Sequence, residues 1–539
     1  MSSPVKVTFH PENIDVSVPF GATIKDAVTL AGIFIDFPCG GQGRCGKCKV
    51  EIEATPSQQN HADKHLPTKE SKRDTRLSCQ TKLEHDTVIF IPKNIQPDRK
   101  KLVSTIRNQR YPFHPLIKKN RPSYGLALDI GTTTVFGILI DLTTGDDLAT
   151  VSETNTQAIH GADVISRINY AITQENGLSN LQQKIIKVIN KIIERLAAIT
   201  SINTIDINDI TIVGNTVMQH LLVNASMETL AAMPFEPAYT GHRNIKSKEL
   251  GITTNPDANV YVFPHIAGFV GGDTVGLILA LGLHHSDKIN LAIDIGTNGE
   301  IVLGSKKQLV CTSTAAGPAF EGVRINNGMR ANTGAIESLR ITNEGVFYKT
   351  IGNTPPEGIC GSGLLDAMAD LIKLKIIDDT GKFRPKKQLE ITNNLSHTLL
   401  DSIRHNSFVI SKSGRNDIII TQEDIREIQL AKAAISAGIQ ILKNQLDVAD
   451  DDIEHIFIAG TFGNYIDKKN AQIIGLIPNT ALEKVVFVGN AAAEGARLAL
   501  ISQNAREETE NIAHTTNFLN LSTDASFQDA FAESIYFNN

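Results

Sequence analysis

Residues 126–134 of the chain read Leu-Ala-Leu-Asp-Ile-Gly-Thr-Thr-Thr, and residues 291–297 read Leu-Ala-Ile-Asp-Ile-Gly-Thr. Each copy has the pattern of a short apolar strand that ends in an acidic residue, followed by a glycine turn and hydroxyl side chains. Self-similarity at two places in a chain indicates two related structural units. The sequence therefore predicts a duplicated α/β domain with one copy of the motif in each half.

The turn after each strand has the chemistry of a phosphate clamp. Gly131 and Gly296 allow the backbone to approach an anion, and the N–H groups and hydroxyls that follow can donate to it. Asp129 and Asp294 end the strands and can hold Mg²⁺ through water. One copy alone reads equally well as an ordinary buried strand and turn, since short motifs often match by chance. Two copies in register favour two clamps that grip one nucleotide across a cleft.

Length and composition describe a soluble protein of several domains. The chain has 539 residues, of which 41% are hydrophobic and 20% charged, and its mean hydropathy is -0.08. A chain of this length exceeds what one hydrophobic core usually holds. No apolar run is long enough to span a bilayer, and the N-terminus lacks the pattern of a signal peptide. We expect a cytoplasmic protein without a membrane segment.

Four of the six cysteines cluster near the N-terminus with the spacing C-x5-C-x2-C-x30-C. They are Cys39, Cys45, Cys48 and Cys79. Cytosolic thiols stay reduced, so clustered cysteines are more often metal ligands than disulfides. Four thiolates are what a [2Fe–2S] cluster requires. Zinc is the competing metal, but the cysteines of a zinc site usually come as two C-x2-C pairs.

The residues around these cysteines predict a small sheet with one helix. The expected strands cover residues 5–9, 14–18, 47–53 and 87–91, and the expected helix covers residues 23–31. The spacing resembles that of vertebrate-type and hydroxylase-type ferredoxins over about the first 95 residues. This resemblance implies a β-grasp ferredoxin-like domain that carries one electron.

Basic residues and prolines concentrate between Lys93 and Arg121. The stretch has neither a recognition motif nor interleaved aromatic residues that could stack on bases, so we expect no nucleic-acid partner. A linker is the natural interpretation, because domain boundaries collect prolines and charged residues. The predicted organisation is a ferredoxin-type domain at 1–95, a linker at 96–122, and two ATPase lobes at 123–288 and 289–539.

The order of strands and helices after residue 123 resembles the acetate and sugar kinase/Hsp70/actin superfamily, which has duplicated ribonuclease H-like lobes. The resemblance implies that Asp129 and Asp294 position Mg²⁺ and the attacking water. It also implies connecting helices near Gly272 and Gly495 that cross at the hinge. The implied nucleotide contacts are Gly131, Thr132, Thr133, Thr134, Gly296, Thr297, Asn298, Gly460 and Gly463, the last two on the adenosine side. Glu300 is a candidate for orienting the water, and a solvated strand residue is the equal alternative.

A ferredoxin module fused ahead of this ATPase fold resembles the reductive activators of corrinoid-dependent proteins. Further stretches carry this resemblance along the whole chain: 155–157, 161–164, 166–167, 213–215, 264–268, 271–273, 316–318, 328–334 and 358–363. It implies a [2Fe–2S] cluster, ATP and Mg²⁺ as cofactors. It further implies transfer of one electron to Co(II) of a corrinoid methyltransferase or corrinoid protein to regenerate Co(I). A low-potential electron donor and a homodimer are also implied.

Three other functions are compatible with parts of the pattern. One is a small-molecule kinase of the acetate and sugar kinase superfamily with a redox-regulatory ferredoxin domain. Another is an activator of a radical dehydratase, against which the four cysteines in one chain argue. The third is a scaffold whose nucleotide site is inactive. The sequence does not identify the corrinoid protein.

Overall fold

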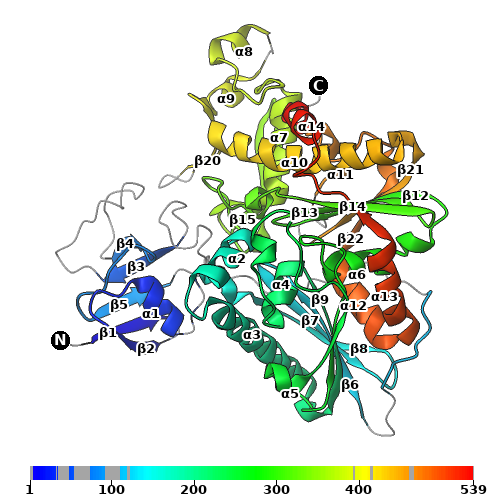
Figure 1. The fold of residues 1–539 in the computed structure, drawn as a ribbon. Helices are drawn as coiled ribbons and strands as arrows, with labels where there is room; N and C mark the ends of the chain where they lie inside the picture. Colours follow the sequence, from blue (N-terminus) through cyan, green and yellow to red (C-terminus); the bar gives the residue numbers. More distant parts are fainter. Residues whose placement is uncertain are drawn as a thin grey trace.

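The computed structural model describes residues 4–11, 13–31, 33, 35, 48–53, 73–91, 110–117, 122–392, 395–412, 417–460 and 466–537. Figure 1 shows a small N-terminal module beside a larger body built around two sheets. The arrangement is a mixed α/β fold in several parts, as predicted.

The N-terminal module is a five-stranded sheet with one helix. Its sheet has the order β2-β1-β5-β3-β4, in which β1 and β5 are parallel and the other pairs are antiparallel. The elements are β1 (Val5–His10), β2 (Ile14–Val18), α1 (Ile24–Leu30), β3 (Lys49–Glu53), β4 (Arg73–Leu77) and β5 (Thr87–Phe90). This is the β-grasp topology that the ferredoxin resemblance implies, and the predicted hairpin and helix are confirmed.

Two six-stranded sheets, which share the topology of five strands and differ in the position of the sixth, form the larger body (Figure 1). In each sheet three successive antiparallel strands lie beside two further strands that run parallel to the first. The first sheet contains β6 (Tyr124–Ile130), β7 (Thr134–Asp141), β8 (Asp147–Thr154), β9 (Ile207–Gly214), β10 (Arg243–Lys246) and β11 (Asn259–Val262). The second contains β12 (Ile289–Ile295), β13 (Gly299–Ser305), β14 (Gln308–Thr314), β21 (Ile453–Ala459), β22 (Val485–Gly489) and β23 (Thr516–Phe518). The repeated topology confirms the predicted duplication.

The strands read as apolar runs because both faces of each sheet are covered. In the first lobe α3 (Gly177–Thr200) packs against β7 and β8, together with α2 (Val164–Thr173) and α4 (Thr216–Leu222). In the second lobe α10 (Gln422–Leu446) packs against β13 and β14. A third buried cluster lies between the sheets and joins strand residues of both lobes to α6 (Gly272–Leu281) and α12 (Ala491–Ile501).

Helices α6 and α12 cross with glycine against glycine. A Cβ atom placed on Gly495 would lie 2.2 Å from the carbonyl oxygen of Gly276, and one on Gly276 would lie 2.9 Å from the carbonyl oxygen of Ala492. No side chain therefore fits between the two backbones. The expectation that small-residue helices cross between the lobes is confirmed.

The remaining elements belong mainly to the second lobe. Two three-stranded sheets extend the second lobe: β15 (Ala335–Thr342), β16 (Gly345–Thr350) and β17 (Gly358–Ile359), then β18 (Ile403–Arg404), β19 (Ser407–Ser411) and β20 (Ile418–Thr421). The other helices there are α7 (Gly361–Lys373), α8 (Lys386–Thr392), α9 (His397–Leu400), α11 (Lys468–Ile473), α13 (Gln503–Thr515) and α14 (Phe527–Ser534). Short α5 (Ser247–Leu250) belongs to the first lobe.

Two contacts join the N-terminal part to the body. Ile159, in the 3₁₀ helix η3 (Thr156–Ile159), is buried in the hydrophobic cluster of the N-terminal module. Residues 110–117 of the linker dock at the junction of α12 and α13, where His114 forms a parallel bridge with Ser502. The linker sequence is compatible with a short helix at residues 102–109, which lie outside the described residues.

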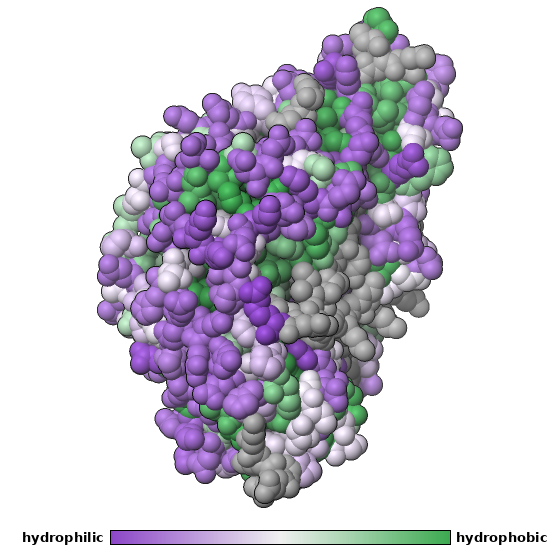
Figure 2. Space-filling model, turned by 90° about the vertical axis from the view of Figure 1, so that its right-hand side faces the viewer, coloured by the Kyte–Doolittle hydropathy of each residue, from purple (hydrophilic) through white to green (hydrophobic). Residues whose placement is uncertain are grey.

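Among the described residues, none of the helices combines the length and the apolar content needed to cross a bilayer. Figure 2 shows one face of the molecule, on which hydrophilic residues predominate and hydrophobic ones are scattered in small groups.

Candidate functional site: a two-loop nucleotide cleft

Both predicted phosphate loops close with a hydrogen bond from the glycine N–H, but the turn of the second loop is one residue shorter. The N–H of Gly131 donates to the carbonyl oxygen of Thr134 at 3.0 Å, and the N–H of Gly296 donates to that of Asn298 at 3.0 Å. A Cβ on Gly131 would lie 2.6 Å from the Thr134 oxygen, so this turn excludes any larger residue at position 131. We call residues 129–134 the first loop and residues 294–298 the second loop.

One carboxylate lies between the two loops. The hydroxyl of Thr133 donates to Oε2 of Glu321 at 3.2 Å, and the hydroxyl of Thr297 donates to Oε1 at 2.6 Å. Glu321 ends the 3₁₀ helix η7 (Pro318–Glu321), which follows β14. The two loops therefore face each other across the span of a single carboxyl group.

This place is a cleft with an empty volume of about 450 Å³. Both loops contribute to its wall, and two arginines stand at its edge. The lining residues are Thr133, Ala158, Ala162, Asp163, Thr297, Pro318, Glu321, Val323, Arg324 and Arg330.

Four carboxylates gather at the ends of the central strands. Asp294 and Glu300 are directly opposite in the pairing of β12 with β13. Burial raises the pKa of Asp129 and that of Asp294 to about 7, and the charge of Asp273 adds to both shifts. Burial raises the pKa of Asp273 to about 6, and burial with the charges of Asp273 and Asp294 raises the pKa of Glu300 well above its usual range. These acidic groups disfavour one another's ionisation, whereas a bound cation would favour it. The group is therefore suited to hold a cation.

The two crossing helices bring their N-termini to these carboxylates. Asp273 lies in the first turn of α6. Asn490 caps α12 by accepting from the N–H of Ala493 at 2.9 Å, and its amide donates to Oδ2 of Asp129 at 2.8 Å. A residue from the second half of the chain thus orients the carboxylate of the first loop.

The first loop is held from behind by buried polar side chains. Arg167 is fully buried, and its guanidinium donates to the carbonyl oxygen of Thr132. The buried amide of Asn155 donates to the carbonyl oxygen of Gly131 at 2.9 Å. Burial lowers the pKa of Arg167 to about 9. These bonds satisfy loop carbonyls that would otherwise lack partners.

Gly460 follows β21 and lies against the second loop. Its φ is +92°, and a Cβ there would lie 2.6 Å from the carbonyl oxygen of Ile295 and 2.8 Å from Oδ1 of Asp294. Its N–H donates to the carbonyl oxygen of Gly489 at 3.1 Å. Glycine is therefore required at this close approach. Gly463, the other predicted adenosine contact, lies outside the described residues.

Two of the four predicted cluster ligands are described. Cys48 and Cys79 are buried, and their Sγ atoms lie 3.2 Å apart. The neighbouring Cys79 and burial together raise the pKa of the Cys48 thiol. Two converging buried sulfurs fit the thiolate set of an iron–sulfur cluster, which ionises its cysteines. Cys39 and Cys45 lie outside the described residues.

Three residues of the site were not predicted as functional: Asp273, Glu321 and Asn490. Asp273 belongs to the Gly-Gly-Asp stretch at 271–273, which carried the family resemblance but received no role. An acidic residue at the start of a small-residue helix could have drawn attention to it, because α6 and its counterpart α12 both lead into the cleft. Glu321 gave no local signal, since its importance comes from two contacts made by residues far away in the sequence.

Comparison with known proteins covers the whole chain. A family model described as a 2Fe-2S iron-sulfur cluster binding domain matches residues 7–84. The model described as the RACo middle region matches residues 124–286, and the one described as the C-terminal domain of RACo, the ASKHA domain, matches residues 288–539.

Relatives of similar architecture have names that agree with these models. The corrinoid activation enzyme RamQ of Eubacterium limosum is 34% identical, with 98% of each chain covered. A [Co(II) methylated amine-specific corrinoid protein] reductase of Methanosarcina barkeri is 27% identical, with 76% of each chain covered. A solved structure titled reductive activator for corrinoid,iron-sulfur protein aligns with a TM-score of 0.71 and 32% identity, covering 99% of this chain and 98% of that one.

The ferredoxin module, the duplicated ATPase fold and full-length similarity to an activation enzyme agree in one chain. The protein belongs to the family of reductive activators of corrinoid proteins.

Proposed function

We propose that this protein reduces the Co(II) state of a corrinoid protein to Co(I) in an ATP-dependent reaction. The observation that carries the proposal is the fusion, in one chain, of a ferredoxin module with a two-loop nucleotide cleft, with similarity to a corrinoid activation enzyme over 98% of both chains. A corrinoid that transfers methyl groups acts as a Co(I) nucleophile, and its oxidation to Co(II) stops the cycle.

ATP is needed because the electron must be given additional energy. The Co(II)/Co(I) couple lies below the range in which cellular thiols work. If the nucleotide-bound protein favours a complex in which the oxidised corrinoid is distorted, each ~1.4 kcal/mol of differential binding shifts a one-electron potential by about 59 mV. A few kcal/mol would then suffice.

The residues of the cleft have distinct roles in this proposal. The N–H groups and hydroxyls of the two loops hold the phosphates, with Thr133 and Thr297 turning from Glu321 toward the nucleotide. Asp129, Asp273 and Asp294 hold Mg²⁺ through water and orient the attacking water, with Glu300 behind them. Cys39, Cys45, Cys48 and Cys79 hold a [2Fe–2S] cluster, which supplies electrons one at a time when bound.

A continuous set of contacts joins the cleft to the ferredoxin module. Arg167 donates to the carbonyl oxygen of Thr132 in the first loop and, at 3.3 Å, to Oε1 of Gln157. Gln157 belongs to η3, whose Ile159 is buried in the ferredoxin cluster. A shift of the first loop on nucleotide binding would therefore move the surface on which the ferredoxin module rests. This path supports coupling between the two parts by physical contact.

Further features of the function are also proposed: hydrolysis of ATP, a low-potential electron donor, a homodimer and a cytoplasmic location. The carboxylates of the cleft support hydrolysis, and the family resemblance supports the donor and the homodimer. The identity of the corrinoid partner is left to experiment.

The test is an anaerobic mixture of the reduced protein with a Co(II) corrinoid methyltransferase, followed by the visible spectrum of Co(I) with and without Mg-ATP. We expect Co(I) only with Mg-ATP, and no Co(I) with Asp294→Asn or Cys48→Ser. The Cys311→Ser variant is the matched control, because Cys311 is a buried thiol on β14 outside the cysteine cluster. No ATP-dependent change with several corrinoid partners would contradict the proposal, and a phosphorylated small molecule formed without any redox partner would favour the kinase.

A further inference from the structure

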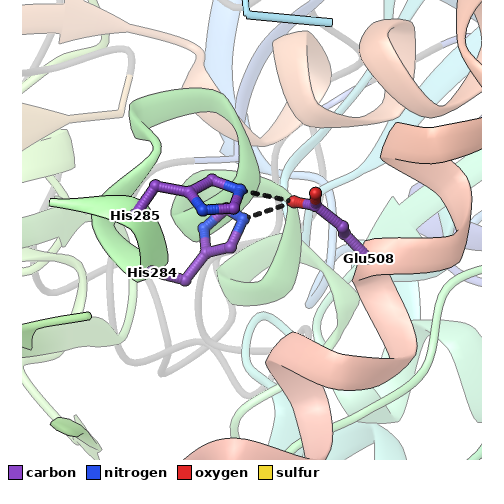
Figure 3. A group of neighbouring side chains, drawn as sticks. All are labelled: His284, His285 and Glu508. Atoms are coloured by element: carbon purple, nitrogen blue, oxygen red, sulfur yellow. Dashed lines mark hydrogen bonds and ion pairs between the residues drawn. The ribbon is translucent and has the colours of Figure 1, made fainter. Parts of the chain in front are cut away.

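A second group of side chains converges outside the nucleotide cleft (Figure 3). His284 and His285 lie in the 3₁₀ helix η6 (Leu283–His285), which connects α6 to β12. Glu508 lies on α13. The Nε2 atom of His284 is 2.7 Å from Oε2 of Glu508, and the Nε2 atom of His285 is 2.9 Å from the same oxygen. Both imidazoles point at one carboxylate from the opposite side (Figure 3).

A third donor reaches this carboxylate from the linker. Tyr111 is buried, and its hydroxyl donates to Oε2 of Glu508 while lying 3.2 Å from Nε2 of His284. Three groups therefore converge on one oxygen atom, whereas a carboxylate oxygen offers about two lone-pair sites. Oε2 of Glu508 thus has one more hydrogen-bonding partner than it can accept from well. A cation between the imidazole nitrogens and the carboxylate would remove this excess.

The two imidazoles and the carboxylate match a known ligand set in type and spacing. Two histidines with one glutamate, plus a water in the fourth position, bind zinc tetrahedrally at ~2.0–2.2 Å, which places ligand atoms about 3.3 Å apart. The ligand atoms of His284, His285 and Glu508 all lie within 4.8 Å of one another. To reach this spacing, the distances of 2.7 and 2.9 Å between the two Nε2 atoms and Oε2 of Glu508 would have to increase by about half an ångström. A rotamer change of the glutamate provides more movement than that.

We propose that His284, His285 and Glu508 form a binding site for a divalent transition metal of the zinc type, with Tyr111 as a partner that orients the carboxylate. Imidazole nitrogens favour zinc and its neighbours over Mg²⁺ and Ca²⁺, which prefer oxygen ligands. Access is open, because the side chains of His285 and Glu508 are 32% and 30% exposed while that of His284 is 8% exposed. The outer hydrogen bond from Tyr111 is the kind of support that ligating carboxylates have.

The site would connect three segments of the chain that belong to different parts of the fold. Its histidines lie on the connection between the two lobes, its glutamate lies on the helix that follows α12, and its tyrosine ends the linker from the ferredoxin module. Metal binding would therefore fix the linker to the hinge. The inference is independent of the corrinoid reaction and of the nucleotide cleft.

The experiment uses the full chain with its iron–sulfur cluster reconstituted anaerobically, so that iron occupies the cysteines and they do not compete for zinc. The protein is treated with a chelator, dialysed and titrated with Zn²⁺ against a chromophoric chelator, and bound zinc and iron are counted by elemental analysis. We expect one zinc per chain. Glu508→Gln and His285→Gln should weaken binding by about 100-fold or more, beyond the 10- to 100-fold that loss of an outer partner costs and that Tyr111→Phe should show.

The matched control is His242→Gln, because His242 contacts Glu510 on α13 and lies outside the proposed metal-binding group. It should leave zinc binding unchanged. Zinc should also raise the thermal midpoint of the wild-type and His242→Gln proteins but not that of Glu508→Gln. The proposal is overturned if the wild-type protein takes up no zinc, or if Glu508→Gln and His285→Gln bind as much zinc, as tightly, as the wild type. Unchanged iron content and cluster absorbance in each variant show that it has folded.

Discussion

The two phosphate loops begin with almost the same sequence, but they differ in the length of the turn and in how they are supported. The first loop rests on the buried side chains of Arg167 and Asn155, both from its own lobe. The second loop has no such pair among the described residues: the N–H of Gly317 donates to the carbonyl oxygen of Thr297 at 3.0 Å, and Gly460 packs against Asp294. The two halves share the motif that can bind an anion, but they differ in the residues that support the loop.

The difference indicates how the two lobes divide their work. The first loop is anchored to η3 and, through it, to the ferredoxin module. The second loop is anchored mainly by backbone contacts within the cleft. We infer that the first loop transmits the presence of nucleotide, while the second serves chiefly to bind it. Four experiments test this comparison.

The largest effect should come from the strand-end carboxylates, which the two loops have in common. Asp129→Asn and Asp294→Asn should each lower the rate of ATP hydrolysis about 100-fold or more, the usual loss for one preorganised electrostatic group. Steady-state release of phosphate measures it. Asp287→Asn is the control, because Asp287 is exposed and pairs with Lys306. Retention of activity in one of the two loop variants would break the functional equivalence of the motifs.

The next effect concerns the support of the first loop. Arg167→Met should lower the free energy of unfolding by about 3 kcal/mol, because several carbonyl groups would lose a charged donor in a buried place. Thr297→Val in the second loop removes a single hydrogen bond and should cost about 1 kcal/mol. Urea denaturation followed by circular dichroism compares the two. Equal costs would mean that the loops are supported alike.

Glu321 allows a test of what lies between the loops. Its carboxylate occupies the space between Thr133 and Thr297, where it would repel phosphates. Glu321→Gln should therefore tighten binding of a non-hydrolysable ATP analogue by about tenfold, or about 1.4 kcal/mol. Glu344→Gln, in the exposed turn between β15 and β16, is the control. Calorimetric titration would contradict the idea if the Gln variant bound the analogue more weakly.

The smallest effect is a pH dependence. Asp129 and Asp294 have pKa values of about 7 in the folded protein against a reference value of 3.8, because burial disfavours their charge. Their contribution to stability is fully present below 3.8 and is lost as the pH rises through about 7, since the folded state binds more protons in that window. The metal-free protein should thus melt a few degrees lower at pH 8 than at pH 6, within the range that about 1 kcal/mol produces.

Mg²⁺ with nucleotide should reverse this trend by binding the ionised carboxylates, so its stabilising effect should be greater at pH 8 than at pH 6. Asp294→Asn should flatten the pH dependence. Identical pH profiles for wild type and variant would remove these carboxylates as its source.

The sequence predicted the parts of this structure that depend on local patterns. Apolar runs located the central strands, and small residues located the crossing helices around Gly276 and Gly495. It missed β4, whose residues Arg73–Leu77 are mostly polar, and the two small sheets of the second lobe, in which some strands are only two residues long. Within the site, Asp129, Asp294 and the loop residues were predicted from their motif. Glu321 could not be, because only the fold brings it between two threonines.

The crossing of α6 and α12 determines how far the side chains of the site move when the two helices rotate against each other. Asp273 lies three residues before Gly276 and Asn490 lies five before Gly495, which at ~1.5 Å per residue are lever arms of about 4.5 and 7.5 Å from the pivot. A rotation of about 10° between the helices would displace these side chains by only about 0.8 and 1.3 Å. Displacements of about 1 Å are enough to change a reaction rate 100-fold. A rotation of this size between the lobes would therefore be enough to change the rate of the proposed nucleotide reaction.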